Sequence, residues 1–223
     1  MRDLIIIARY PKPGTSKTRL GRQIGYENSA ELAQCILEDL MATASLVCDI
    51  TIAAPSLEDA VLFKNSYPSR RIFTASRMHI LYQGLESIKN NFKTKPEHHI
   101  ISLLGDMLVT EQDLDTWYAS FQRHDLLFGL SHDGGLYMTG MKNTFGQKFV
   151  CYLTDTPTYS NFIAACYKSL KHFPRIRFAH IKRDIDFLDD LFAQEIPLQY
   201  TKTRNFIKNH QYYFPRAYVQ LYT

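Results

Sequence analysis

The sequence predicts an α/β protein built on an open, mostly parallel β-sheet flanked by helices. First, the uninterrupted apolar run at residues 4–8 has the β-branched composition of a strand that is buried on both faces. Second, extended segments alternate with helical ones along most of the chain, which is the order of a parallel sheet with crossover helices. Third, two late extended segments flank a tight-turn sequence, which adds a hairpin to that sheet.

Strands and helices alternate through the first half of the chain. After a loop at residues 9–22, Asn28 and Glu31 have the spacing of a capping box and predict the start of a long crossover helix. Ser56 and Asp59 predict the start of a shorter helix in the same way. The remaining expected elements of this half are strands at 49–55, 70–75 and 98–106 and a helix at 78–92.

The second half of the chain contains the expected hairpin. Thr110 and Asp113 predict the cap of a helix that runs to about Arg123. Residues 125–131 and 136–141 are extended, and the turn sequence HDGG separates them. The last expected elements are a helix at 158–172, a strand at 175–181 and a short helix at 186–196.

The composition is that of a single globular domain over residues 1–223. Hydrophobic residues make up 45% and charged residues 22% of the chain, which excludes wholesale disorder. The early apolar run is too short to cross a membrane and leads into a basic loop, so we expect a cytoplasmic protein with no membrane span. Four cysteines form no CxxC pair and are expected to be reduced thiols.

The excess of basic residues is confined to the C-terminal segment. There are 26 lysines and arginines against 22 acidic residues, and four of the basic residues follow Glu195, the last acid. A protein that coats duplex nucleic acid spreads basic charge over its main fold, so nucleic acid is not an expected partner. The segment at 200–223 is also rich in tyrosine and phenylalanine, and we expect it to pack on the domain as an aromatic, basic extension.

Ligands of an open parallel sheet bind beyond the carboxyl ends of its strands, and a basic loop occupies one such position. Residues 9–22 contain five cations and no acid, and Gly14 permits close approach of a ligand. Lysine and arginine together favour a di- or triphosphate, while a solvated basic loop is the alternative. A Walker loop is excluded, because Pro11 and Ser16 stand where its glycines would be.

Three carboxylates are candidate metal ligands. Asp106 ends the buried run of an expected strand, where an oxygen ligand can hold Mg²⁺ or Mn²⁺ against nucleotide phosphates. Asp184 and Asp186 are two residues apart, so on an extended segment they face the same way and can complete the metal shell. The structural alternatives are a loop-capping hydrogen bond for Asp106 and, for Asp186, the acidic first turn of a helix with Asp189 and Asp190.

The turn at residues 132–135 is a further candidate region. Asp133 can shape the turn while Gly134 and Gly135 supply conformational freedom, and the same glycines can admit a sugar or a base against the backbone. Asp133 is also our candidate for the acid–base residue. No serine stands in a nucleophile-elbow pattern, so covalent hydrolysis is not expected.

Motifs along most of the chain form a larger pattern. The chain opens with IIIARYPKPGTSKTRLG (5–21), followed by SRM (76–78), LLGD (103–106), DGGLYMTG (133–140) and DIDFLDDL (184–191). In this order they resemble the motifs of the small bacterial glycosyltransferase-A-like proteins of unknown function. Pro11, Gly14 and residues 17–20 match the opening motif of that family, and Arg9 replaces its lysine. The resemblance spans about residues 3–191.

That family is similar to nucleotide-sugar transferases and to the molybdenum-cofactor and phospholactate guanylyltransferases. The resemblance implies a nucleotide-diphospho-sugar transferase fold, of the GT-A, Rossmann-like type, with the basic loop near nucleotide phosphates and a strand-end aspartate near Mg²⁺ or Mn²⁺. The candidate site residues are then Lys12, Gly14, Lys17, Thr18 and Arg19 for the nucleotide phosphates, Asp106, Asp184 and Asp186 for the metal ion, Asp133 for catalysis, and Gly134 and Gly135 on the acceptor side.

The chain departs from the family pattern at two places. Met107 and Leu108 follow Asp106 where the family usually has a small residue and proline, and Asp106 stands alone instead of in an Asp-x-Asp pair. Leu136 occupies a position where an aromatic residue is common. The leading hypothesis is glycosyl transfer from a nucleoside diphosphate sugar to a small acceptor. The alternatives are nucleotidyl transfer to a phosphorylated small molecule and a catalytically silent nucleotide-binding or scaffold protein.

Overall fold

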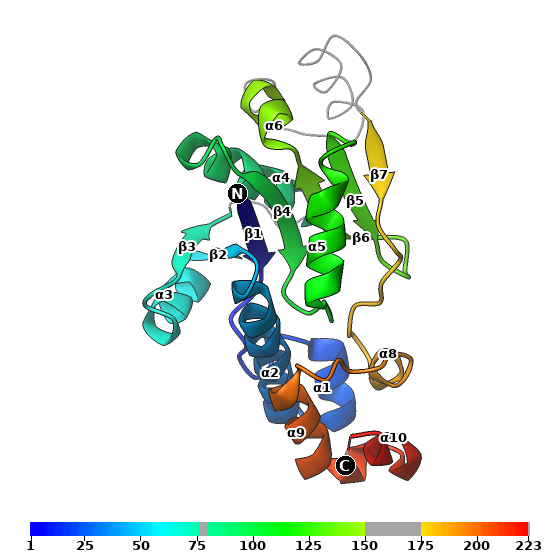
Figure 1. The fold of residues 1–223 in the computed structure, drawn as a ribbon. Coiled ribbons are helices and arrows are strands. Elements are labelled where there is room, and N and C mark those ends of the chain that lie inside the picture. Colours follow the sequence, from blue (N-terminus) through cyan, green and yellow to red (C-terminus); the bar gives the residue numbers. More distant parts are fainter. Residues whose placement is uncertain (76–79, 150–174, 223) are drawn as a thin grey trace.

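A seven-stranded sheet forms the centre of the computed structural model, which describes residues 1–75, 80–149 and 175–222 (Figure 1). The strand order is β3-β2-β1-β4-β6-β5-β7. Within it only β6 runs antiparallel to its neighbours. The expected open, mostly parallel sheet is therefore confirmed. The strands are β1 (Arg2–Ile7), β2 (Asp49–Ala54), β3 (Arg71–Thr74), β4 (His99–Leu104), β5 (Leu126–Leu130), β6 (Leu136–Met141) and β7 (Ile176–Phe178).

Helices cover both faces of the sheet and extend beyond one end of it (Figure 1). Helices α4 and α5 lie on opposite faces, while α1, α2 and α9 gather near the carboxyl ends of β1 and β4. The helices are α1 (Thr18–Ile24), α2 (Tyr26–Ser45), α3 (Leu57–Ser66), α4 (Ile80–Thr94), α5 (Glu111–Ser120), α6 (Asn143–Phe149), α8 (Leu188–Phe192), α9 (Thr201–Asn209) and α10 (Arg216–Gln220), with a 3₁₀ turn at Gln211–Tyr213.

Side chains alternate along β1 between two hydrophobic cores. Leu4 and Ile6 belong to the larger core, which includes the apolar faces of α2, α5 and α9. Ile5 and Ile7 belong to the smaller core, which includes the side of α4 that faces the sheet. Because successive residues of a strand point to opposite faces, a continuous apolar run is what a strand between two helical layers requires.

Two of the three predicted helix caps are confirmed. The Ser56 hydroxyl accepts a hydrogen bond from the Asp59 backbone N–H at 3.0 Å, and Thr110 with Asp113 forms a complete capping box. The Asn28 cap is wrong, because α2 begins two residues earlier and the Asn28 amide donates to the Ile24 carbonyl at 2.7 Å. The cause is Gly25, whose φ of 87° separates α2 from a helix that the sequence did not predict.

That additional helix is α1, which shortens the predicted loop at residues 9–22. The segment adopts helical geometry from Thr18 onward, so its last cations lie on a helix. The β5–β6 hairpin is formed as predicted. At its centre Tyr137 packs over Gly129, where any Cβ would collide with the ring.

The C-terminal segment packs against α2 and against the segment that follows β4. The buried Asp39 carboxylate of α2 accepts hydrogen bonds from the Thr203 backbone N–H and hydroxyl, each at 2.8 Å. The Tyr200 side chain is fully buried, and Phe206, Phe214, Tyr218 and Tyr222 are also buried. These contacts place α9 beside α2 (Figure 1).

Some expectations lie outside the described residues, namely the SRM motif, the helix at 158–172, and Cys151 and Cys166. Cys35 and Cys48 carry free thiols, and burial raises the pKa of each to about 11. None of the helices in the described ranges is both long and apolar enough to span a membrane.

Candidate active site

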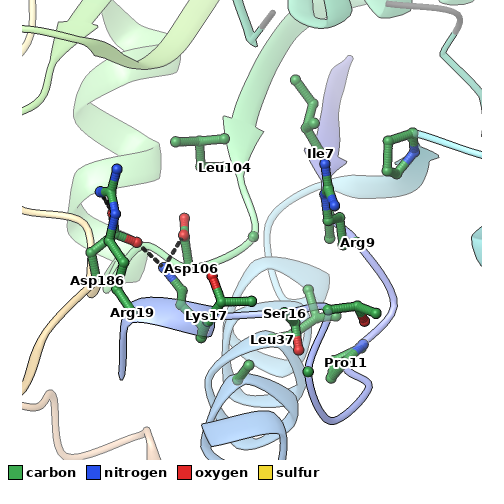
Figure 2. A pocket seen from close by; sticks show the side chains of 17 residues that line it. Ile7, Arg9, Pro11, Ser16, Lys17, Arg19, Leu37, Leu104, Asp106 and Asp186 are labelled. Carbon is green, nitrogen blue, oxygen red and sulfur yellow. Dashed lines mark hydrogen bonds and ion pairs between the residues drawn. The ribbon is translucent and has the colours of Figure 1, made fainter. Parts of the chain in front are cut away.

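The carboxyl ends of β1 and β4 open onto a cavity of about 720 Å³ (Figure 2). The two strands are parallel neighbours, with Ile7 beside Leu104, so the segments that follow them leave the sheet side by side. Gly105 makes this close exit possible, because a Cβ there would lie 2.8 Å from the Ala8 Cβ. The cavity lining includes residues 14–19 and 104–106 together with Asp186. The predicted meeting of the basic loop with the strand-end aspartate is confirmed.

A tight turn aims the basic loop at this cavity. The Lys12 carbonyl accepts hydrogen bonds from the Thr15 and Ser16 backbone N–H groups, both at 3.2 Å. Gly14, inside this turn, has a φ of 75°. Lys17 follows with φ 48° and ψ 45°, and in the described ranges it is the one non-glycine residue with positive φ. A left-handed conformation at such a residue costs about 1–3 kcal/mol and is typical of functional sites.

The strained residue places an ammonium group between two carboxylates (Figure 2). Lys17 Nζ donates hydrogen bonds to Asp106 Oδ2 and, at 3.2 Å, to Asp186 Oδ1. Its side chain is 9% exposed. Burial lowers the pKa of Lys17, but the charges of Asp106 and Asp186 and their hydrogen bonds outweigh it, so the pKa is raised. The ammonium is therefore charged throughout the neutral range.

A second cation reaches one of these carboxylates, Asp186, from the solvent side. Arg19 donates to Asp186 Oδ2 at 2.5 Å, and its guanidinium lies over the Phe187 ring, 5.8 Å from the centroid. Its side chain is 62% exposed. Arg19 thus contacts Oδ2 of Asp186, while Lys17 contacts Oδ1 of the same carboxylate.

The third predicted carboxylate, Asp184, interacts with this cluster through its charge but is absent from the lining of the cavity. Asp184 is partly buried, and burial raises its pKa, with further contributions from the negative charges of Asp106 and Asp186. Asp106 Oδ1 is buried and has no hydrogen-bond partner in the described part of the chain. Carboxylate oxygens that repel one another, one of them unpaired, form a donor set suited to a hard divalent cation. Asp106 and Asp186 therefore suit Mg²⁺ or Mn²⁺, which proteins often hold through one or two carboxylates, although the three aspartates are not a set whose oxygens all lie within 4.8 Å of one another.

The remaining predicted phosphate contacts differ in their placement. Thr18 and Gly14 line the cavity. Lys12 is absent from its lining, and its ammonium pairs with Glu58 Oε1 of α3 at 2.5 Å. Three polar residues of the lining, Arg9, Thr15 and Ser16, are missing from the predicted set. Arg9 stands in the same run of cations, so the charge pattern carries a signal for it, whereas nothing in the pattern distinguishes Ser16.

Asp133 lies in the β5–β6 turn and outside the lining of the cavity. Its Oδ1 accepts hydrogen bonds from the Ser131 hydroxyl and, at 2.9 Å, from the Gly135 backbone N–H. These hydrogen bonds lower the pKa of Asp133, and the positive charge of Arg19 also contributes. Gly134 has a φ of 88°, so the turn needs a glycine at that position.

A different cluster of potential metal ligands lies at the amino-terminal ends of β1, β2 and β4, which is the opposite end of the strands from the cavity. Asp3, Asp49 and His98 bring one ligand atom each within 4.8 Å of one another. His98 directly precedes β4 and Asp106 follows it, so about 16 Å of strand separates the two clusters. In the cluster of Asp3, Asp49 and His98, the Lys95 ammonium pairs with both carboxylates, at 3.0 Å from Asp3 and 3.2 Å from Asp49. This cluster therefore cannot serve the cavity.

No family model matches this sequence, and no curated protein matches it. Solved structures do resemble the fold. A protein from Desulfovibrio desulfuricans G20, provisionally named a nucleotide-diphospho-sugar transferase, superposes with a TM-score of 0.76 at 17% identity, over 100% of this chain and 99% of that one. A cytidylyltransferase from Leptospira borgpetersenii gives 0.53 at 15% identity, over 97% and 98%.

A third solved structure is 4-diphosphocytidyl-2C-methyl-D-erythritol synthase from Anaerococcus prevotii, with a TM-score of 0.54 at 12% identity, over 86% of this chain and 94% of that one. At such identities the likeness concerns the fold alone. The chain has a nucleotide-diphospho-sugar transferase-like fold, as predicted. The finer resemblance to the small bacterial family and to guanylyltransferases stays a prediction.

Proposed function

We propose that this protein transfers a group from an activated nucleotide and that its donor is a nucleoside diphosphate sugar. The observation that carries the proposal is the contact between Lys17 and Asp106 inside one cavity. In this contact a cation of the type that binds phosphate lies beside a carboxylate of the type that binds a metal ion, at the carboxyl ends of the strands, where ligands of open α/β sheets bind. The fold shared with a provisionally named nucleotide-diphospho-sugar transferase supports the choice of donor.

The residues of the cavity divide into two groups around the diphosphate of the donor. Lys17, Arg19 and Thr18 bind its oxygens, and Gly14 lets the backbone approach them. Asp106 and Asp186, with Asp184 interacting through its charge, would hold Mg²⁺ or Mn²⁺, and the ion when bound would neutralise the charge of the departing diphosphate. By analogy with oxyanion-binding groups, loss of one such contact costs about 2–4 kcal/mol of transition-state stabilisation.

The transfer needs an acceptor on the other side of the sugar. The acceptor hydroxyl attacks the anomeric carbon, the bond from that carbon to the diphosphate breaks, and the nucleoside diphosphate leaves with the electron pair. Gly134 and Gly135 border the acceptor, and Asp133 accepts a hydrogen bond from its hydroxyl. Because the pKa of Asp133 is lowered, it is a weak base that orients the hydroxyl and takes its proton late.

A second candidate function is nucleotidyl transfer from a nucleoside triphosphate to a phosphorylated small molecule. The observation that favours it is the buried pair Met107 and Leu108, which leaves Asp106 without the second aspartate of an Asp-x-Asp motif. The cytidylyltransferase fold is also similar. In that reaction the acceptor phosphate attacks the α-phosphorus and pyrophosphate leaves.

Nucleotide binding and turnover test the proposal together. Nucleoside diphosphate sugars and nucleoside triphosphates are compared by thermal unfolding with and without Mn²⁺, and product release is followed by ³¹P NMR. We expect a diphosphate sugar to raise the unfolding temperature only with Mn²⁺, and Asp106→Asn to abolish that rise. Pyrophosphate release from a triphosphate would instead support the second candidate. Stabilisation without metal or turnover would identify a silent binder, and no stabilisation by any nucleotide would refute the proposal.

A further inference from the structure

The centre of the carboxylate cluster is filled by an amino group of the chain itself. Lys17 Nζ contacts Asp106 and lies 3.2 Å from Asp186 Oδ1, and its charge also acts on Asp184. We infer that Lys17 is an internal counter-cation that occupies the metal position in the free protein, so that a divalent ion binds there only by displacing the lysine ammonium. The class of anion that then receives the ammonium, a diphosphate, rests on the proposed function.

The backbone of Lys17 is fixed in a conformation that directs its side chain into the cluster. The residue immediately precedes α1 in the left-handed region, and its side chain makes no capping hydrogen bond to that helix. A residue in this position is usually a serine, threonine, asparagine or aspartate that caps the helix. The Lys17 side chain therefore contacts the carboxylates and leaves the N-terminus of α1 without a side-chain cap.

Burial distinguishes Lys17 from the other cation of the cluster. The Lys17 side chain is 9% exposed, whereas that of Arg19 is 62% exposed. Because the Arg19 side chain is exposed, it can move from Asp186 into solvent without leaving a buried carboxylate unpaired. Withdrawal of Lys17 leaves Asp106, which has one oxygen already unpaired, without a counter-ion until a metal ion arrives.

Charge balance makes simultaneous occupancy unfavourable. Three aspartates face two basic residues in the cluster, so the free protein carries only a small local negative charge. A divalent ion that joined Lys17 at Asp106 would reverse this balance and place two cations in contact. When the ammonium moves to a diphosphate in the cavity, both cations have anionic partners, and metal and nucleotide then favour each other's binding reciprocally.

The test measures Mn²⁺ binding without nucleotide, by electron paramagnetic resonance of free Mn²⁺ during titration of the full chain. Lys17→Met removes the ammonium but keeps an apolar stem, and Lys17→Gly removes it while accepting the left-handed backbone. We expect both variants to bind Mn²⁺ at least tenfold more tightly than the wild-type protein. Lys202→Met breaks a lysine–carboxylate pair with Glu38 remote from the cavity, and it should leave Mn²⁺ affinity within twofold.

Two further measurements keep the outcome unambiguous. Asp106→Asn combined with Lys17→Gly should abolish the gain, which separates this site from the cluster of Asp3, Asp49 and His98. Circular dichroism establishes that each variant is folded, and Mn²⁺ should raise the unfolding temperature of Lys17→Gly more than that of the wild type.

The inference and the proposed function fail in different ways. Equal Mn²⁺ affinity in the wild type and in both folded Lys17 variants would overturn the inference, whatever nucleotides do. A gain in Mn²⁺ affinity that persists in the Asp106→Asn background would overturn it as well. If the Lys17 variants bind Mn²⁺ more tightly, if Asp106→Asn abolishes that gain, and if the protein binds no nucleotide, the inference is upheld and the proposed function is overturned.

Discussion

The Tyr200 hydroxyl accepts a hydrogen bond from the Val109 backbone N–H at 2.9 Å and donates one to the Val109 carbonyl at 3.1 Å. The Tyr200 side chain is fully buried, and burial raises its pKa. The segment between Asp106 and α5 therefore takes its shape partly from a residue near the C-terminus. Through this contact the C-terminal segment supports one wall of the candidate active site.

Tyr200→Phe should destabilise the protein by about 1–3 kcal/mol, because it leaves a buried backbone N–H without a partner. Urea unfolding measures the loss. Tyr212→Phe is the control, since that side chain is 71% exposed, and it should change stability by less than about 0.5 kcal/mol. Equal losses in the two variants would contradict the assigned role of the Tyr200 hydroxyl.

The residues that immediately precede β5 and β7, Asp125 and Arg175, form an ion pair whose contribution to stability depends on pH. Asp125 accepts hydrogen bonds from the Arg175 backbone N–H at 3.0 Å and from its guanidinium at 3.1 and 3.2 Å. Burial raises the pKa of Asp125, but the hydrogen bonds and charge of Arg175 lower it more, so it lies below its ordinary value of 3.8. Ionised Asp125 thus stabilises the fold above that value, and this contribution is lost as the pH falls through the folded pKa.

Asp125→Asn should accordingly lower the urea midpoint at pH 7 and converge with the wild type as the pH falls below about 4. Asp115→Asn breaks an exposed ion pair with Arg2 and should have little effect at any pH. A difference between Asp125→Asn and the wild type that stays constant down to pH 3 would rule out the linkage.

The sequence predicts those features whose cause is local. The caps at Ser56 and Thr110 are visible because a helix cap needs only side chains three residues apart. The buried strand β1 is visible because its composition reflects burial on both faces. The cap at Asn28 is wrong because the same spacing occurs inside a helix, and only the break at Gly25 determines where α2 begins.

In the candidate site, too, some features can be predicted from the sequence and others depend on residues far apart in the chain. Parallel topology places the end of β1 beside the end of β4, so the proximity of the basic loop to Asp106 is predictable. Which cation enters the cavity is decided by distant partners. Lys12 is turned toward Glu58 by α3, and Lys17 is drawn to Asp186, a residue 169 positions away in the chain. Spacing in the sequence contains no information about such pairs.

Gly105 sets the distance between the segments that leave β1 and β4. Gly105→Ala should destabilise the protein by about 1–3 kcal/mol, because the new methyl group lies 2.8 Å from the Ala8 Cβ and crowds Leu37 as well. Adding Ala8→Gly removes the nearest contact and should recover part of the loss. A double-mutant cycle in urea measures this coupling, and strictly additive effects would show that the two methyl groups do not collide.

The first two cations of the basic loop, Arg9 and Lys12, offer a further test of the proposed donor site. Arg9 lines the cavity, whereas Lys12 pairs with Glu58 outside it. A charge-assisted hydrogen bond to a phosphate contributes about 1.5–3 kcal/mol, so Arg9→Met should weaken nucleoside diphosphate binding by about 10- to 100-fold. Lys12→Met should weaken it less than Arg9→Met does, because its charge is already paired. Calorimetric titration with Mn²⁺ present compares them, and a larger loss for Lys12→Met would mean that the loop turns over when the nucleotide binds.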